Sequence, residues 1–142
     1  MEKIISVVSP IELDGVWDDC SKLLQKGLLC SDGEITIDQA RLFLVQGSMR
    51  LLICRKEGKI ISALLAELIH FPNYRCVNVI SLGGKNLLMN QEDIKQLKKI
   101  CKGWGASKIQ GWTHPKMTEY LCKQGFEKKY DVVRINIEKD IE

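Results

Sequence analysis

A carboxylate inside one apolar segment offers the clearest acid–base chemistry in this sequence. Glu67 interrupts the apolar run Ile60–Phe71, and a carboxylate held near a cleft can act as a general base. If Pro72-Asn73 forms the turn of a β-hairpin, Glu67 faces Asn78 on the following strand. The same register also suits a hydrogen-bonded polar pair with a purely structural role, so two interpretations of Glu67 stay open.

The two histidines add little further chemistry. In the same hairpin register His70 faces Arg75. His114 precedes Pro115, which favours an extended backbone just before a helix and therefore a capping or surface role. No Ser-His-Asp order, Cys-His dyad or metal cluster can be argued from two histidines at these positions.

The six cysteines are Cys20, Cys30, Cys54, Cys76, Cys101 and Cys122. They include no Cys-x-x-Cys pair and match no zinc-ligand spacing. Most of them lie in apolar runs, where cysteine packs as a small hydrophobic residue. We therefore predict reduced thiols and no metal site.

Hydrophobic periodicity predicts the elements that must position these residues. Strands are expected over residues 4–8, 50–55, 60–71, 75–82 and 108–112, and helices from residue 13 to the glycine at 27 or the turn at 31–33, over 36–46, over 90–103, and after the proline at 115. Short turns make the middle three strands antiparallel, whereas a helical crossover makes the strand over 108–112 parallel to its predecessor. After Phe126 we expect one further strand beside Lys108–Trp112.

These elements predict a single α/β domain over residues 1–142, with a mixed, mostly antiparallel sheet and helices on both faces. Apolar residues make up 45% of the chain and charged residues 27%, as in an ordinary globular protein. No signal-peptide core or membrane-length apolar run is visible, so we expect a soluble intracellular protein without a membrane partner. The net charge of +3 comes without a basic stripe interleaved with aromatic residues, which argues against a nucleic-acid partner.

The order of these elements resembles the GNAT (N-acetyltransferase-like) fold, most specifically over Cys76–Ile137, where Gly125-Phe126 follows the last helix. A finer resemblance, to small GNAT-like proteins encoded by tailed bacteriophages, rests on the strings Ser31–Asp38, Gln46–Met49 and Ser81–Gly84 and on His114-Pro115. That resemblance implies a phage gene, often near virion genes.

The GNAT resemblance also implies where a cofactor would bind. GNAT enzymes hold the pyrophosphate of acetyl-CoA with backbone N–H groups of a glycine-rich loop and of the helix that follows it. The matching positions here are Leu82, Gly83, Gly84 and Lys85. The family's Gln/Arg-x-x-Gly-x-Gly/Ala pattern is absent from this loop.

The helix after this loop begins with its own negative charges. Asn90 is the expected N-cap, and Glu92 and Asp93 follow in the first turn. Their carboxylates stabilise the positive end of the helix and would repel a phosphate. The residues therefore predict a degenerate site with weak or absent binding of acetyl-CoA.

A catalytic acid is the second role that the resemblance implies. The family often uses a tyrosine four residues before the Gly-Phe pair to protonate the leaving thiolate, and that position is Leu121. Tyr120 lies one position earlier, about 100° round the helix. Tyr120 is thus either a displaced acid or a core aromatic residue.

Three functions remain open after this comparison. The first is a bacteriophage GNAT-fold protein with a degenerate acetyl-CoA site that acts as a virion-associated or assembly protein and binds phage structural or host proteins. The second is an acetyl-CoA-dependent N-acetyltransferase of unknown acceptor. The third is a host-directed inhibitor. Each of these would operate in the host cytoplasm or be incorporated in the virion.

Overall fold

A computed structural model describes residues 3–29, 31–85 and 90–138 of the chain. These residues divide into two compact units, one up to Trp112 and one from Thr113 onward. Each unit is described by itself. No helix in the described part of the chain is long and apolar enough to cross a bilayer.

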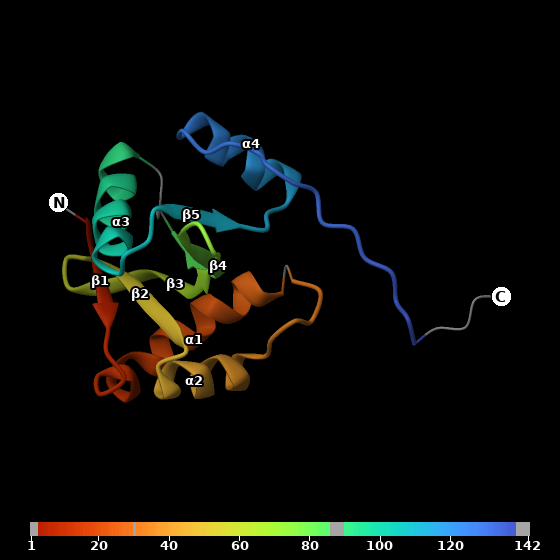
Figure 1. Ribbon diagram of the computed structural model, residues 1–142. Coiled ribbons are helices and arrows are strands. Elements are labelled where there is room, and N and C mark those ends of the chain that lie inside the picture. Colours follow the sequence, from red (N-terminus) through yellow and green to blue (C-terminus); the bar gives the residue numbers. More distant parts are fainter. Residues whose placement is uncertain (1–2, 30, 86–89, 139–142) are drawn as a thin grey trace. The chain divides into compact units, whose positions relative to one another are not determined.

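The first unit is built on a five-stranded sheet. Its elements are β1 (Lys3–Val8), α1 (Leu13–Leu28), α2 (Ile37–Gln46), β2 (Met49–Lys56), β3 (Lys59–His70), β4 (Arg75–Gly84), α3 (Gln91–Gly103) and β5 (Lys108–Gly111). The strands lie in the order β1-β2-β3-β4-β5, and all neighbours are antiparallel except β4 and β5. Figure 1 shows α1 and α2 on one side of the sheet and α3 on the other. The predicted fold class, a mixed and mostly antiparallel sheet with helices on both faces, is confirmed.

The alternation of side chains along the strands decides which helix covers which face. Leu51 and Ile53 of β2 pack into a cluster with residues of α1 and α2. Leu52 and Cys54 point to the opposite face and are equally buried. The residues that α3 buries include Ile94, Leu97 and Cys101. Because both faces are covered, β2 carries a continuous apolar run instead of alternating apolar and polar residues.

The boundaries of α2 follow the capping signals of the sequence. Thr36 Oγ1 accepts a hydrogen bond from the Gln39 N–H at 3.2 Å, and Gln39 Oε1 accepts one from the Thr36 N–H at 2.9 Å. This reciprocal pair is the predicted capping box. The helix ends at Gly47, whose φ of 80° is the left-handed conformation that glycine adopts most readily.

Helix α1 crosses β4 so closely that the contact leaves no room for side chains. A Cβ atom on Gly83 would lie 1.8 Å from the carbonyl oxygen of Leu23, and one on Gly27 would lie 2.1 Å from Ser81 Oγ. At the same crossing, Ser81 Oγ donates a hydrogen bond to the Leu24 carbonyl at 2.8 Å. The two glycines therefore allow the backbone of the helix to rest on the strand.

The second unit contains α4 (Pro115–Lys123) and the chain beyond it. The predicted strand after Phe126 is wrong for the described residues, since none of residues 127–138 belongs to a strand. Val133 and Ile137 are each 91% exposed. β-branched residues favour a strand only where another strand is available for pairing, and the local sequence does not specify that partner.

A buried ion pair joins β1 to the first turn of α3. Lys3 Nζ lies 2.7 Å from Asp93 Oδ2, and the two side chains are 14% and 1% exposed. Next to it, the Ile5 N–H donates to Gln96 Oε1 at 2.9 Å. A buried carboxylate that loses its paired cation destabilises the folded state.

We predict that Lys3→Met destabilises the fold by about 3 kcal/mol, because it leaves the Asp93 carboxylate buried without its cation. The matched control is Lys129→Met, which removes a lysine at the same 2.7 Å distance from Glu127, where both side chains are mostly exposed. Urea unfolding should show a lowered midpoint for the first variant and an unchanged midpoint for the control. Equal effects of the two substitutions would contradict the role of burial.

The five described cysteines are free thiols, and four of them are buried: Cys20, Cys54, Cys76 and Cys101. Cys30 lies outside the described residues. Desolvation raises the pKa of Cys20 and of Cys101 to about 11. Desolvation also raises the pKa of Cys54 and of Cys76. A thiolate is therefore scarce at all four buried positions near neutral pH.

Alkylation should distinguish these thiols. In a Cys30→Ser background, we expect native protein at pH 8 to take up iodoacetamide quickly at the exposed Cys122 alone. The buried thiols should react only after unfolding in urea, which brings the total to five labels by mass spectrometry. Rapid native labelling at Cys20 or Cys101 would contradict the raised pKa, and the loss of two labels after unfolding would indicate a disulfide.

Candidate active site

The outer edge of β4 is open beyond an irregularity in the sheet. β5 pairs with β4 only from Cys76 to Val79, whereas β4 continues to Gly84. On its other side, β4 shifts register against β3, because Ala66 pairs with Val79 and Leu65 with Ser81. Ile80 is therefore an extra residue in β4, as in a β-bulge. Among the described residues of the first unit, no strand pairs with the outer side of β4 after this point, whereas β3 stays paired on the inner side.

Backbone groups line that open edge. The Lys85 N–H donates to the Ile61 carbonyl at 3.0 Å, so Lys85 faces β3. In an antiparallel ladder alternate residues share this direction, and the N–H and C=O of Leu82 and Gly84 consequently point away from β3. An edge of this kind can pair with an extended chain that carries amide groups.

A row of polar side chains crosses the sheet where β4 and β5 part. Asn78 Nδ2 donates to Glu67 Oε1 at 3.1 Å, and Gln110 Nε2 donates to Asn78 Oδ1 at 3.5 Å. Asn78 is 3% exposed, and Glu67 is half-buried. The amide of Asn78 is thus engaged on both sides and orients the Glu67 carboxylate.

The sequence predicted most of this row. The pairing of Glu67 with Asn78 is confirmed. The pairing of His70 with Arg75 is confirmed too, with Arg75 Nε donating to His70 Nδ1 at 3.1 Å. Gln110 was missed, although its place in the strand predicted over residues 108–112 could have indicated it.

The first turn of α3 corrects one electrostatic prediction. Asn90 Oδ1 accepts a hydrogen bond from the Asp93 N–H at 3.0 Å, so the predicted cap is present. The Asp93 carboxylate, however, is buried and paired with Lys3. The repulsion predicted for Asp93 is therefore weakened, because its charge is paired and turned inward. Glu92 is exposed and keeps that role.

Comparison with known proteins gives a clear result for the fold. No protein-family model and no curated protein matches the chain. Among solved structures, an aminoglycoside acetyltransferase from an uncultured soil metagenomic sample is similar with a TM-score of 0.69 and 16% identity, over 96% of this chain and 99% of that one. A predicted acetyltransferase from Clostridium acetobutylicum, solved with acetyl-CoA, has a TM-score of 0.66 and 13% identity, over 96% and 97%. A ribosomal-protein-alanine N-acetyltransferase from Brucella melitensis biovar Abortus has a TM-score of 0.64 and 14% identity, over 95% and 100%.

The chain has the GNAT fold. At these identities the likeness concerns the fold and not the activity. The GNAT resemblance of the sequence is confirmed at this level. Nothing in the comparisons indicates a bacteriophage origin or a role in a virion.

Close backbone contacts also explain why glycines occupy the predicted cofactor loop. Gly83 is required where the backbone of Leu23 approaches β4. Gly84 has a φ of 109°, and a Cβ atom there would lie 2.3 Å from the Ile61 carbonyl oxygen. Both glycines are thus needed for folding, and their presence alone does not indicate a phosphate loop. Residues 86–89 of the loop lie outside the described residues.

The other predicted site residues, Tyr120 and His114, belong to the second unit. Tyr120 is half-buried on α4 in the second unit, and its role as an acid stays a prediction. His114 is the N-cap residue of α4, and its side chain makes no capping bond. In residues 3–29, 31–85 and 90–138, no group of three or more His, Cys, Asp or Glu side chains is arranged to hold a metal ion.

Proposed function

We propose that this chain is an acetyl-CoA-dependent N-acetyltransferase that binds its cofactor along the outer edge of β4. The observation that carries this proposal is the open edge beyond Ile80, where Leu82 and Gly84 direct backbone donors and acceptors away from β3. The edge lies at the carboxyl end of the parallel pair β4–β5, where open α/β sheets bind ligands. The acetyltransferase from Clostridium acetobutylicum that shares this fold was solved with acetyl-CoA.

The residues present fit the chemistry of that cofactor. Leu82 and Gly84 would pair with the amides of its pantetheine arm, as one strand pairs with the next. The ammonium of Lys85 and the first turn of α3 would face its phosphates, since a helix N-terminus favours anions. When bound, acetyl-CoA supplies an acetyl thioester that an amine can attack.

Glu67 is the candidate general base. An amine must lose a proton to become a nucleophile, and a carboxylate held in place can accept that proton. Asn78 holds one carboxylate oxygen, and Oε2 makes no hydrogen bond within the described part of the chain. The second oxygen can therefore accept the proton while the first stays anchored. Tyr120 is the predicted acid for the thiolate.

A second candidate function is binding without acetyl transfer. It is favoured by the start of α3, where Asn90 occupies one N–H that an anion could use and Glu92 adds an exposed negative charge. A degenerate site of this kind would suit an assembly protein or a host-directed inhibitor. The bacteriophage origin, the virion association and phage or host protein partners belong to this alternative and rest on the sequence resemblance alone.

Thermal denaturation tests cofactor binding. We expect saturating acetyl-CoA to raise the melting temperature, since ligand at 100 times its dissociation constant adds about 2.7 kcal/mol to stability. Leu82→Pro should abolish the shift, because proline has no N–H and is tolerated at a strand edge. Leu82→Ala keeps the N–H and should keep the shift. A wild-type melting curve unmoved by millimolar acetyl-CoA would favour the second candidate function.

Glu67→Gln tests the base. Glutamine can still accept the hydrogen bond from Asn78, so we expect unchanged melting and an unchanged acetyl-CoA shift. The rate of CoA release should fall by about 100-fold, the low end for a lost general base. The control is Glu57→Gln, in the exposed turn between β2 and β3.

The assay would follow CoA by chromatography with a panel of primary amines. The panel would include an aminoglycoside and a peptide that begins with alanine, the kinds of acceptor named for similar structures. Retained activity together with a lower melting temperature in Glu67→Gln would instead indicate a structural cross-strand pair.

A further inference from the structure

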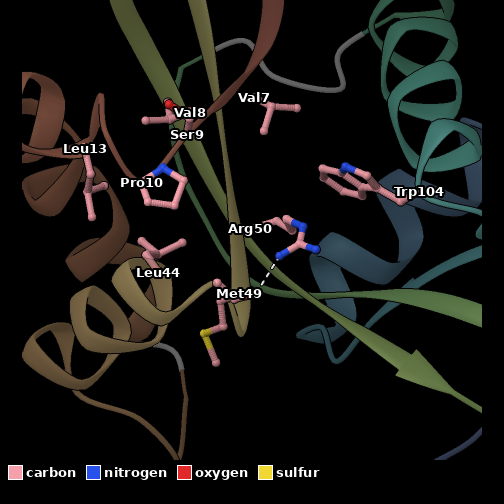
Figure 2. Close-up of a pocket in the computed structure, with 10 residues that line it drawn as sticks. Val7, Val8, Ser9, Pro10, Leu13, Leu44, Met49, Arg50 and Trp104 are labelled. Atoms are coloured by element: carbon pink, nitrogen blue, oxygen red, sulfur yellow. Dashed lines mark hydrogen bonds between the residues drawn. The ribbon is translucent and has the colours of Figure 1, made fainter.

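A cavity lies at the end of the sheet where β1 ends and β2 begins. Its volume is about 250 Å3. The described residues that line it are Val7, Val8, Ser9, Pro10, Leu13, Leu44, Gly47, Met49, Arg50 and Trp104. Most of them are apolar, and Arg50 is the one charged residue among them (Figure 2).

This cavity is separate from the edge proposed for acetyl-CoA. Met49 pairs with Glu67 of β3, whereas Leu82 pairs with Leu64. Those two positions on β3 are three residues apart, or about 10 Å along the strand. The cavity also lies on the β2 side of β3, and the open edge lies on the β4 side.

Arg50 is held in place at the cavity by two contacts. Its Nη1 donates to the Gly47 carbonyl at 2.7 Å, and its guanidinium carbon lies 5.9 Å from the centre of the Trp104 ring. Figure 2 shows the guanidinium between the Trp104 ring and the turn that leads into Met49. Arg50 forms no ion pair with any described residue, and a guanidinium has five N–H donors. Several donors of a fixed cation therefore remain available at the cavity.

The backbone of Trp104, whose indole forms one wall of the cavity, is anchored as well. The Trp104 backbone N–H donates to the Cys101 carbonyl at 3.1 Å, and the Trp104 backbone carbonyl accepts from Arg75 Nη1. Ser9, the one hydroxyl at the cavity, donates its Oγ–H to Glu12 Oε1 at 2.8 Å. The polar group left for a ligand is thus Arg50, and the surfaces around it are apolar.

A second stacked arginine in the same unit shows what Arg50 lacks. Arg41 lies over the Trp17 ring at 5.5 Å, much as Arg50 lies over Trp104. Arg41 is also paired with Asp14, at 2.8 Å between Nη2 and Oδ1. Arg50 has the same aromatic support and an open cavity in place of the carboxylate.

We propose that this cavity binds a small carboxylate with an apolar body about the size of a phenyl ring. The guanidinium matches a carboxylate in charge and in planar geometry, and it can bind both oxygens at once. A volume of about 250 Å3 equals that of roughly eight water molecules in the liquid. This volume suits a ring with a short acidic side chain, whose body would lie against Pro10, Leu44 and Met49.

Calorimetric titration of the full chain with phenylacetate, without CoA, tests the proposal. We expect saturable binding that weakens at least about 10-fold in Arg50→Gln, and Arg50→Lys should fall between the two. The matched control Arg41→Gln should bind like the wild type. Phenylacetamide, which has the same shape without the charge, should bind at least about 10-fold more weakly than phenylacetate.

Proton–nitrogen NMR gives an independent reading of the site. The chain has three tryptophans, and the Trp104 indole signal, assigned from a Trp104→Phe spectrum, should move on titration more than that of Trp112. Absence of saturable binding, equal binding by phenylacetamide, or unchanged affinity in Arg50→Gln would each overturn the proposal. A Trp112 shift larger than that of Trp104 would place the ligand elsewhere and overturn it too.

Discussion

The backbone of α1 rests directly on β4, and much of the architecture depends on that contact. Leu23 can approach Gly83, and Ser81 can approach Gly27, only because two side chains are missing at the crossing. A larger residue at either position would push the helix away from the sheet and open the cluster that α1 shares with α2 and β2. The crossing covers one face of β4. Within the first unit, the outer edge of β4 is unpaired beyond Val79 because β5 ends there, next to the bulge at Ile80.

The end of β4 and the first turn of α3 are each held by contacts with other strands. At the end of β4, the Lys85 N–H is bonded to the Ile61 carbonyl of β3. In the first turn of α3, the Asp93 carboxylate is paired with Lys3 of β1. The buried Asp93 carboxylate stabilises the positive N-terminal end of α3, and the ammonium of Lys3 balances its charge. An anionic ligand at this end would meet the charge of Glu92 without the added charge of Asp93.

Features set by residues close together in the sequence could be predicted, whereas features set by residues far apart in the sequence could not. The capping box at Thr36 and the pairing of Glu67 with Asn78 were predictable, because each follows from a few neighbouring residues or from one turn. The neutralised charge of Asp93 was not predictable, since Lys3 lies 90 positions away. Likewise, Gly83 looked like part of a phosphate loop because the helix that requires a glycine there is remote in the sequence.

The cavity beside Arg50 was invisible to the sequence for the same reason, as it joins the end of β1, the end of α2 and the residue after α3. The two proposed sites lie at different ends of one sheet and would recognise ligands by different chemistry. At the β4 edge the available groups are backbone amides, which every residue type carries, so almost no sequence signal marks that edge. At the β2 end the group is a guanidinium fixed by Gly47 and Trp104, which is specific to these side chains. A cofactor held mainly by backbone groups tolerates wide sequence change in its protein. The acetyltransferase structures with this fold are 9% to 16% identical to this chain, so the fold is kept even where the loop pattern is lost.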